Sequence, residues 1–291
     1  MQTEAAGNVS RPRYVDVYGA DHSPWVQAVL LGLHEAGIEH RLRSLPTMES
    51  FLRTGVFMPL ASIDGGDWQP ESAEILQGIG FSEVSLDEMR LVNAAWRGVW
   101  HRPDSAALVF GAFSLAGDQN ASRLKRMASN FVRSFIPFYM YLLIKTVNLT
   151  AQTRPLDNYG NQFVALEERL AEQNSRFLSG DAPDSLDFLA FGIIQCHCSV
   201  YVPPVTALQT DPRLTRVRDW IAAMHERLTE YRHLYSGSYF APAASPPVWA
   251  SRLDRIAFWL GLATMIALFP ITVPLVVFLA MRQRLKTREN T

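Results

Sequence analysis

The sequence predicts a small α/β domain, an all-helical domain after it, and an apolar helix near the C-terminus. Residues 14–80 alternate short β-type segments with apolar helical runs. From Leu86 onward the β-type segments stop, and five segments repeat their apolar residues with the 3.6-residue period of a helical bundle. Residues 256–281 then contain no charged side chain.

The first domain begins with a strand and a helix. Residues 14–19 (YVDVYG) are rich in β-forming residues and alternate in polarity, which predicts a short strand. Ser23 and Pro24 precede an apolar run of helical period that ends at Gly37. Serine suits the N-cap, proline the first helical position and glycine the residue after a helix, so a helix is predicted between them.

Shorter segments complete this domain. Residues 38–46 alternate as a second strand, and residues 56–63, which include Pro59, are expected to form a third. An Asp-Gly-Gly turn follows, and Pro70 is expected to open a second helix. Residues 81–85 are expected to link the two domains.

These patterns set the domain boundaries. The predicted segments are a disordered N-terminus (1–12), the α/β domain (13–81), the all-helical domain (86–236), a linker rich in proline and alanine (237–250), a membrane anchor (255–281) and a basic tail (282–291).

Composition narrows the function classes. The formal net charge is −1, which argues against a nucleic-acid partner. Cys196 and Cys198 are the two cysteines and stand one residue apart, so they form no disulfide framework and indicate a reducing compartment. The N-terminus lacks the apolar core of a signal peptide, so the folded part is expected to face the cytoplasm.

The apolar segment is expected to hold the chain on membrane lipid. Its 26 residues exceed the roughly 20 needed to cross a bilayer. Pro270 and Pro274 allow either a kinked single span or a re-entrant hairpin. The basic tail favours a cytoplasmic C-terminus, which a hairpin would give and a single span would not. The sequence thus allows a single span or a hairpin, and the single span is preferred.

Three segments resemble the glutathione transferases, in the order in which that family has them. They are VYGADHSPWVQAVLLGLHEAGIEHRL (17–42), MPLASIDGGDWQPESAEIL (58–76) and FLSGDAPDSLDFLAFG (177–192). The resemblance implies a thioredoxin-like domain that binds glutathione, with an all-helical domain after it. It also implies conjugation or reduction of a hydrophobic small molecule, an electrophile, with glutathione as co-substrate. Because the family is commonly dimeric, a homodimer is a further expectation.

The resemblance assigns the catalytic role to Ser23, whose hydroxyl would stabilise the glutathione thiolate beside the positive end of the first helix. The plainer interpretation is an ordinary N-cap serine. Tyr18 is the alternative thiolate partner, since some branches use a tyrosine near the end of the first strand. Position 23 is not cysteine, which argues against the thiol-reductase branches.

The resemblance also implies a glutathione-binding set. The backbone of Met58, turned by a cis-proline at Pro59, would pair with the peptide part of glutathione, and Glu71 and Ser72 would hold its γ-glutamyl end. Without the resemblance, Pro59 fits an ordinary edge-strand proline, and Glu71 and Ser72 fit the charged and capped first turn of a helix. The basic residue that usually precedes the third strand is absent, and Arg53 is the nearest substitute.

Three larger side chains are assigned to the co-substrate pocket. The family's first bundle helix lines that pocket, which implicates Met89 and Trp96, and Trp25 follows the Ser-Pro step. An aromatic stripe at this spacing is also typical of an ordinary core.

Two further patterns are given structural interpretations. Asp184 and Asp187 fit a helix N-cap and its third residue, and Cys196-His197-Cys198 fits a helical core. Neighbours on a helix point apart and cannot close a tetrahedral site, so no metal site is expected. The rival to an enzyme is a non-catalytic protein of this fold that serves as a binding scaffold docked at the membrane.

Overall fold

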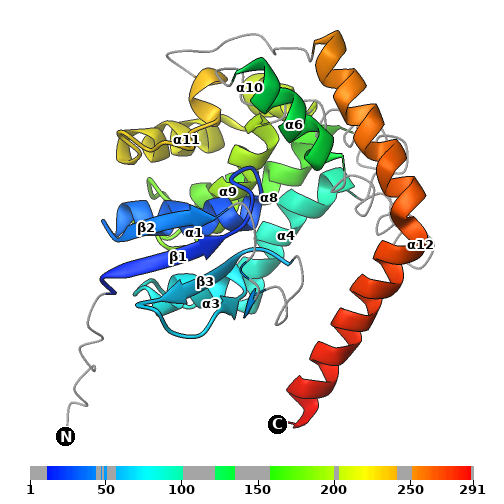
Figure 1. Ribbon diagram of the computed structural model, residues 1–291. Coiled ribbons are helices and arrows are strands. Elements are labelled where there is room, and N and C mark those ends of the chain that lie inside the picture. Colours follow the sequence, from blue (N-terminus) through cyan, green and yellow to red (C-terminus); the bar gives the residue numbers. More distant parts are fainter. Residues whose placement is uncertain are drawn as a thin grey trace, which may run out of the picture.

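The computed structural model describes residues 12–43, 47, 49–50, 57–100, 122–134, 158–199, 203–240 and 251–289 (Figure 1). The expected disordered N-terminus, Arg53 and most of the expected linker lie outside these residues. The described strands are β1 (Tyr14–Tyr18), β2 (Glu39–Arg43), β3 (Leu60–Ile63) and β4 (Gln69–Pro70). The described helices are α1 (Pro24–Glu35), α3 (Ser72–Gly78), α4 (Leu86–Trp100), α6 (Arg123–Arg133), α8 (Val164–Gln173), α9 (Ser185–Ser199), α10 (Pro203–Thr210), α11 (Thr215–Arg227) and α12 (Arg252–Glu289), with the short 3₁₀ helices η1 (Tyr159–Phe163) and η2 (Ser236–Ser238).

The four strands form one mixed sheet in the order β2-β1-β3-β4. β1 runs parallel to β2 and antiparallel to β3, and β3 runs antiparallel to β4. The helix between two parallel strands, followed by a hairpin and a further helix, is the thioredoxin-like arrangement, and the predicted fold class is confirmed.

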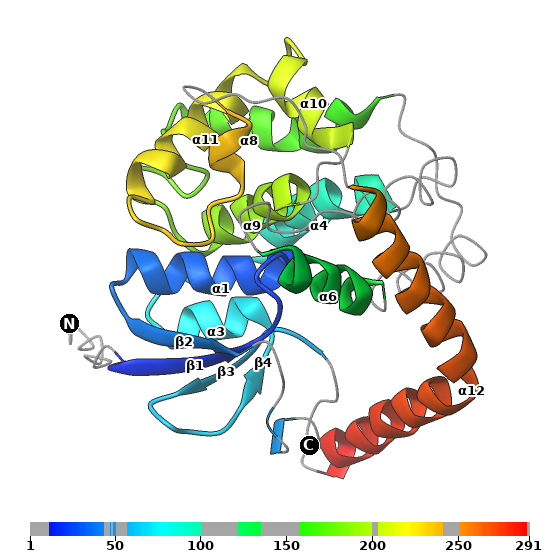
Figure 2. The same cartoon turned by 45° about the horizontal axis from the view of Figure 1, so that its top comes forward.

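The helices stack in layers above this sheet. Figure 2 shows α1 and α3 on one face of the sheet, with α9 and α4 as the next layer and α8, α10 and α11 beyond them. Helices α1 and α9 pack closely where Gly192 lies against the start of α1. A Cβ at Gly192 would lie 2.3 Å from the carbonyl oxygen of Pro24, so this approach requires glycine. One continuous core therefore joins the two domains.

The predicted ends of α1 agree with the structure. Ser23 occupies the N-cap with extended backbone angles, and Pro24 is the first helical residue. Gly37 adopts a φ of +65° just past the C-terminus of the helix, in the left-handed region that favours glycine.

Helix α9 is capped as its sequence indicates. Asp184 precedes the helix, and its backbone N–H donates to the carboxylate of Asp187 at 3.3 Å. Asp187 also accepts from the indole N–H of Trp220 at 2.8 Å and from the backbone N–H of Leu178 at 2.8 Å. Burial raises the pKa of Asp187, although these hydrogen bonds oppose the shift.

Three predicted boundaries differ from the structure. Pro70 does not open a helix: it pairs with Leu60 in β4, and the helix begins at Ser72. The expected linker starts too early, because Phe240 is buried in the core and η2 precedes it. The expected tail does not start a separate segment, since α12 runs on to Glu289.

Helix α12 is continuous through Pro270 and Pro274, so the turn of a re-entrant hairpin is not present in the described chain. Figure 2 shows a bend between the orange and red halves of the helix, and internal prolines are a common cause of such bends. The stretch Arg252–Thr272 is the one described helix long and apolar enough to cross a membrane.

Candidate functional site

The register of the sheet brings three segments to one end of it. Tyr18 of β1 pairs with Leu60 of β3, which pairs with Pro70 of β4. Residues that follow β1, precede β3 or follow β4 therefore lie beyond the same end of the sheet. The predicted site residues at this end are Ser23, Met58, Pro59, Glu71 and Ser72.

Ser23 is nearly buried and caps α1 through its backbone alone. Its carbonyl oxygen accepts from the N–H of Gln27 at 2.8 Å, and its own N–H donates to the carbonyl of Ala20 at 2.9 Å. The hydroxyl makes no capping hydrogen bond. Ser23 is therefore the N-cap residue, but its hydroxyl is not used by the helix start.

The Met58-Pro59 peptide bond is cis, the geometry that the resemblance implied. The Met58 sulfur accepts from the backbone N–H of Ala20 at 3.4 Å. This contact places Met58 directly beside the loop that leads from β1 to Ser23.

Glu71 has an unusual backbone. Its φ is +71°, which is rare for a non-glycine residue, and its side chain is exposed. A strained backbone of this kind persists only where the surrounding structure holds it in place, and such residues cluster at functional sites. Ser72, the first residue of α3, is buried directly behind it.

The alternative thiolate partner is part of the core. Tyr18 is buried in a small cluster with Leu60 and Trp68, and burial raises the pKa of its phenol. A phenol enclosed by apolar groups is poorly placed to donate a hydrogen bond to a thiolate. Arg53, the candidate for the glycyl carboxylate, lies outside the described residues.

A polar cluster beside Ser23 was not found from the sequence. The carboxylate of Asp21 accepts from the Tyr235 hydroxyl at 2.7 Å and from His233 Nδ1 at 3.3 Å, and His22 Nδ1 lies 3.8 Å from it. Burial raises the pKa of Asp21, but the interactions with His22, His233 and Tyr235 outweigh it and hold the pKa well below its usual range. The loop before Ser23 is thereby fixed to the C-terminal end of the helical domain.

The expected co-substrate residues partly come together. Trp25 and Trp96 meet edge to face with ring centroids 6.1 Å apart, at the boundary between the two domains. Trp96 also stacks on His197 at 6.2 Å. Met89 is half-buried against the same core. These contacts fit both a pocket wall and a packed core.

Solved structures with a similar fold include glutathione-binding proteins. A maize glutathione S-transferase I in complex with an atrazine glutathione conjugate is 18% identical, with 77% of this chain and 96% of that chain covered and a TM-score of 0.42. A theta-class glutathione S-transferase from Xanthomonas axonopodis with glutathione bound is 15% identical (77% and 97% covered, TM-score 0.42). Glutaredoxin 2 from Salmonella typhimurium with glutathione is 13% identical (79% and 99% covered, TM-score 0.46).

No protein-family model and no curated protein sequence matches the chain.

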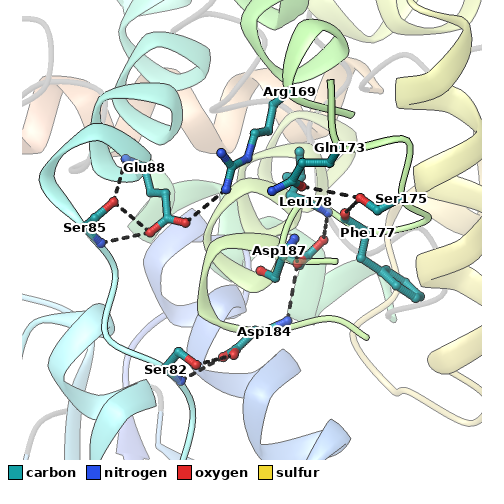
Figure 3. Close-up of polar contacts among 11 residues, drawn as sticks. Ser82, Ser85, Glu88, Arg169, Gln173, Ser175, Phe177, Leu178, Asp184 and Asp187 are labelled. Atoms are coloured by element: carbon teal, nitrogen blue, oxygen red, sulfur yellow. Dashed lines mark hydrogen bonds and ion pairs between the residues drawn. The ribbon is translucent and has the colours of Figure 1, made fainter. Parts of the chain in front are cut away.

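A second polar cluster connects the domains away from this site (Figure 3). The backbone N–H and hydroxyl of Ser82 donate to the Asp184 carboxylate at 2.9 and 2.6 Å, and Arg169 lies 3.5 Å from Glu88. A cavity of about 160 Å³ opens between these side chains and Ser185. Arg169 pairs with Glu88, and the Asp184 carboxylate accepts its hydrogen bonds from Ser82 and Ser185, so the cluster fixes the interdomain segment.

The Cys196-His197-Cys198 run is fully buried in α9, which confirms the core interpretation. Burial raises the pKa of the Cys198 thiol well above its usual value. Among the described residues, no group of three or more His, Cys, Asp or Glu side chains is placed to hold a metal ion.

Proposed function

We propose that this chain is a glutathione transferase-like protein that acts on hydrophobic electrophiles at a membrane surface. The observation that carries the proposal is the register Tyr18–Leu60–Pro70, which gathers the three candidate segments at one end of the sheet. Glutathione is a peptide-like anion with an ammonium group and a thiol, and each of these needs a different partner.

The assignments follow from the chemistry of each group. The exposed carboxylate of Glu71 pairs with the ligand's ammonium, and Ser72 with the neighbouring amides of α3 receives its α-carboxylate. The backbone of Met58 pairs with the peptide part. The unused hydroxyl of Ser23 donates to the thiolate, with the N-terminus of α1 adding a favourable field.

The membrane part of the proposal rests on α12. Its exposed apolar side chains include Trp259, Leu260 and Phe278, and a continuous helix of this composition is suited to a bilayer. In both views β1 points toward the side of the molecule where α6 and α12 lie (Figures 1 and 2). An electrophile dissolved in lipid would then reach the thiol from that side.

Calorimetry with glutathione on the full chain in detergent tests the proposal. Glu71→Gln keeps the shape of the side chain and removes its charge, so a lost charge-assisted hydrogen bond worth about 1.5–3 kcal/mol should weaken binding by roughly ten- to a hundredfold. Glu74→Gln is the matched control, because Glu74 is also exposed on α3 and should leave the affinity unchanged. If the wild-type chain does not bind glutathione at millimolar concentration, the proposed enzymatic function is refuted and a non-catalytic binding scaffold is favoured.

A further inference from the structure

The contact between α6 and α12 has a polar centre. The Nε atom of Arg126 donates to both carboxylate oxygens of Asp254 at 3.1 Å, and Asn130 Nδ2 donates to one of them at 3.1 Å. Ser251 adds its hydroxyl at 2.6 Å. The side chains of Asp254 and Arg126 are 6% and 22% exposed, so the carboxylate is buried and the guanidinium partly buried between the helices.

Small residues bring the two backbones close together. A Cβ at Gly261 would lie 2.3 Å from both the Phe131 carbonyl oxygen and the Ser134 hydroxyl. Close approach at small residues is typical of helix pairs in membranes. Arg126 is opposite Asp254, and Ser134 is opposite Gly261, so the two helices run parallel.

Both helices also expose large apolar side chains. On α6 the exposed fraction is 80% for Leu124 and 57% for Val132, and on α12 it is 63% for Trp259 and 59% for Leu260. Helix α12 also buries apolar residues, among them Phe258 and Met265. The pair nevertheless buries the Asp254 carboxylate and leaves these four large apolar side chains exposed, which suits surroundings made of hydrocarbon.

Basic side chains lie at the N-terminal end of both helices. Arg123 and Lys125 in the first turn of α6, and Arg252 and Arg255 in the first turn of α12, are all exposed. Because the helices are parallel, the four side chains lie near the same level, just before the apolar stretch of α12 begins. Basic side chains at the start of a membrane helix attract anionic lipid headgroups.

We infer that α6 is a second membrane element, which inserts beside the first half of α12 into an anionic phospholipid leaflet. The acyl chains contact Leu124 and Val132, and the anionic headgroups bind the four basic side chains at the helix starts. The Arg126–Asp254 ion pair stays between the two helices. The inference rests on the proposed membrane attachment through α12, and it adds that the folded body is itself seated in the lipid surface.

A lipid-quenching experiment on the full chain tests this inference. An environment-sensitive dye is attached to Val132→Cys on α6, to Trp259→Cys on α12 or to the control Glu172→Cys on α8, whose native residue is exposed. The native cysteines are buried and should stay unlabelled. In phosphatidylcholine–phosphatidylserine vesicles with quenchers on the acyl chains, fluorescence should fall for the first two and stay unchanged for the third.

The outcomes separate the inference from the attachment on which it rests. Quenching at Trp259 without quenching at Val132 would overturn it and leave α12 as the membrane contact. Quenching at neither would refute the membrane attachment itself. Self-quenching of the Val132 dye without lipid quenching would assign that face to a second copy of the chain.

A second measurement needs no substitution. A photoreactive phospholipid should label the tryptic peptide 127–133 of the wild-type chain, since that peptide carries the exposed Val132. Label confined to peptides of α12 would contradict the inference.

Discussion

His197 should make the folded protein sensitive to acid. Its ring is 3% exposed, lies between Trp96 and Phe163, and has no hydrogen-bond partner for either nitrogen among the described residues. Burial lowers its pKa from 6.5 to about 3. Below pH 6.5 His197 is protonated in the unfolded chain but stays neutral in the folded chain. The free energy of unfolding therefore falls as the pH falls.

The size of the effect follows from this shift. Each pH unit between the two pKa values lowers the free energy of unfolding by about 1.4 kcal/mol, so the loss reaches about 2 kcal/mol at pH 5. His197→Leu should therefore match or exceed the wild type at pH 7, because it removes two unpaired nitrogens from the core, and should escape the loss at pH 5.

Urea unfolding of the full chain in detergent at pH 7, 6 and 5 measures this difference. His40→Leu on β2 is the control for removing a histidine outside the helical core. Equal pH dependence of the wild type and His197→Leu would show that the folded chain protonates His197 readily, and would refute the reasoning.

Three other changes have defined outcomes. Gly192→Ala should cost about 3 kcal/mol by thermal unfolding, because its methyl would clash with the Pro24 carbonyl; an unchanged melting temperature would contradict the α1–α9 packing. Asp187→Ala leaves the Trp220 indole N–H unpaired in the core and should cost about 3 kcal/mol by urea unfolding; a loss below about 1 kcal/mol would show that water replaces the carboxylate. A cysteine at Thr291 should react with an impermeant thiol reagent only from the side opposite the folded domain, whereas labelling from the same side would support a hairpin.

Local signals in the sequence predicted the elements that depend on them. The Ser-Pro start and the glycine end of α1 were correct, because caps are set by the residues at the helix ends. Pro70 was misassigned because its strand pairing is made with Leu60 and is not visible locally. Phe240 was placed in a linker because its burial depends on residues far away in the chain.

The candidate site was predictable only in part. The resemblance named Ser23 and Glu71, and the sheet register was needed to bring their segments together. The cluster around Asp21 and the Arg126–Asp254 pair join residues more than a hundred positions apart, so no periodicity or spacing reveals them. The sequence placed Ser23 at the N-cap, but only the structure shows that its hydroxyl makes no capping hydrogen bond.

The pH titration of the glutathione thiol bound to the full chain tests the central claim most directly. Thiolate absorbance should show a midpoint below that of free glutathione, because the Ser23 hydroxyl and the N-terminus of α1 stabilise the anion. Ser23→Ala should raise the midpoint with little change in affinity, and Ser23→Thr, which keeps the hydroxyl, should largely preserve it. A bound thiol that titrates like free glutathione in the wild-type protein would contradict the claim that this site activates glutathione.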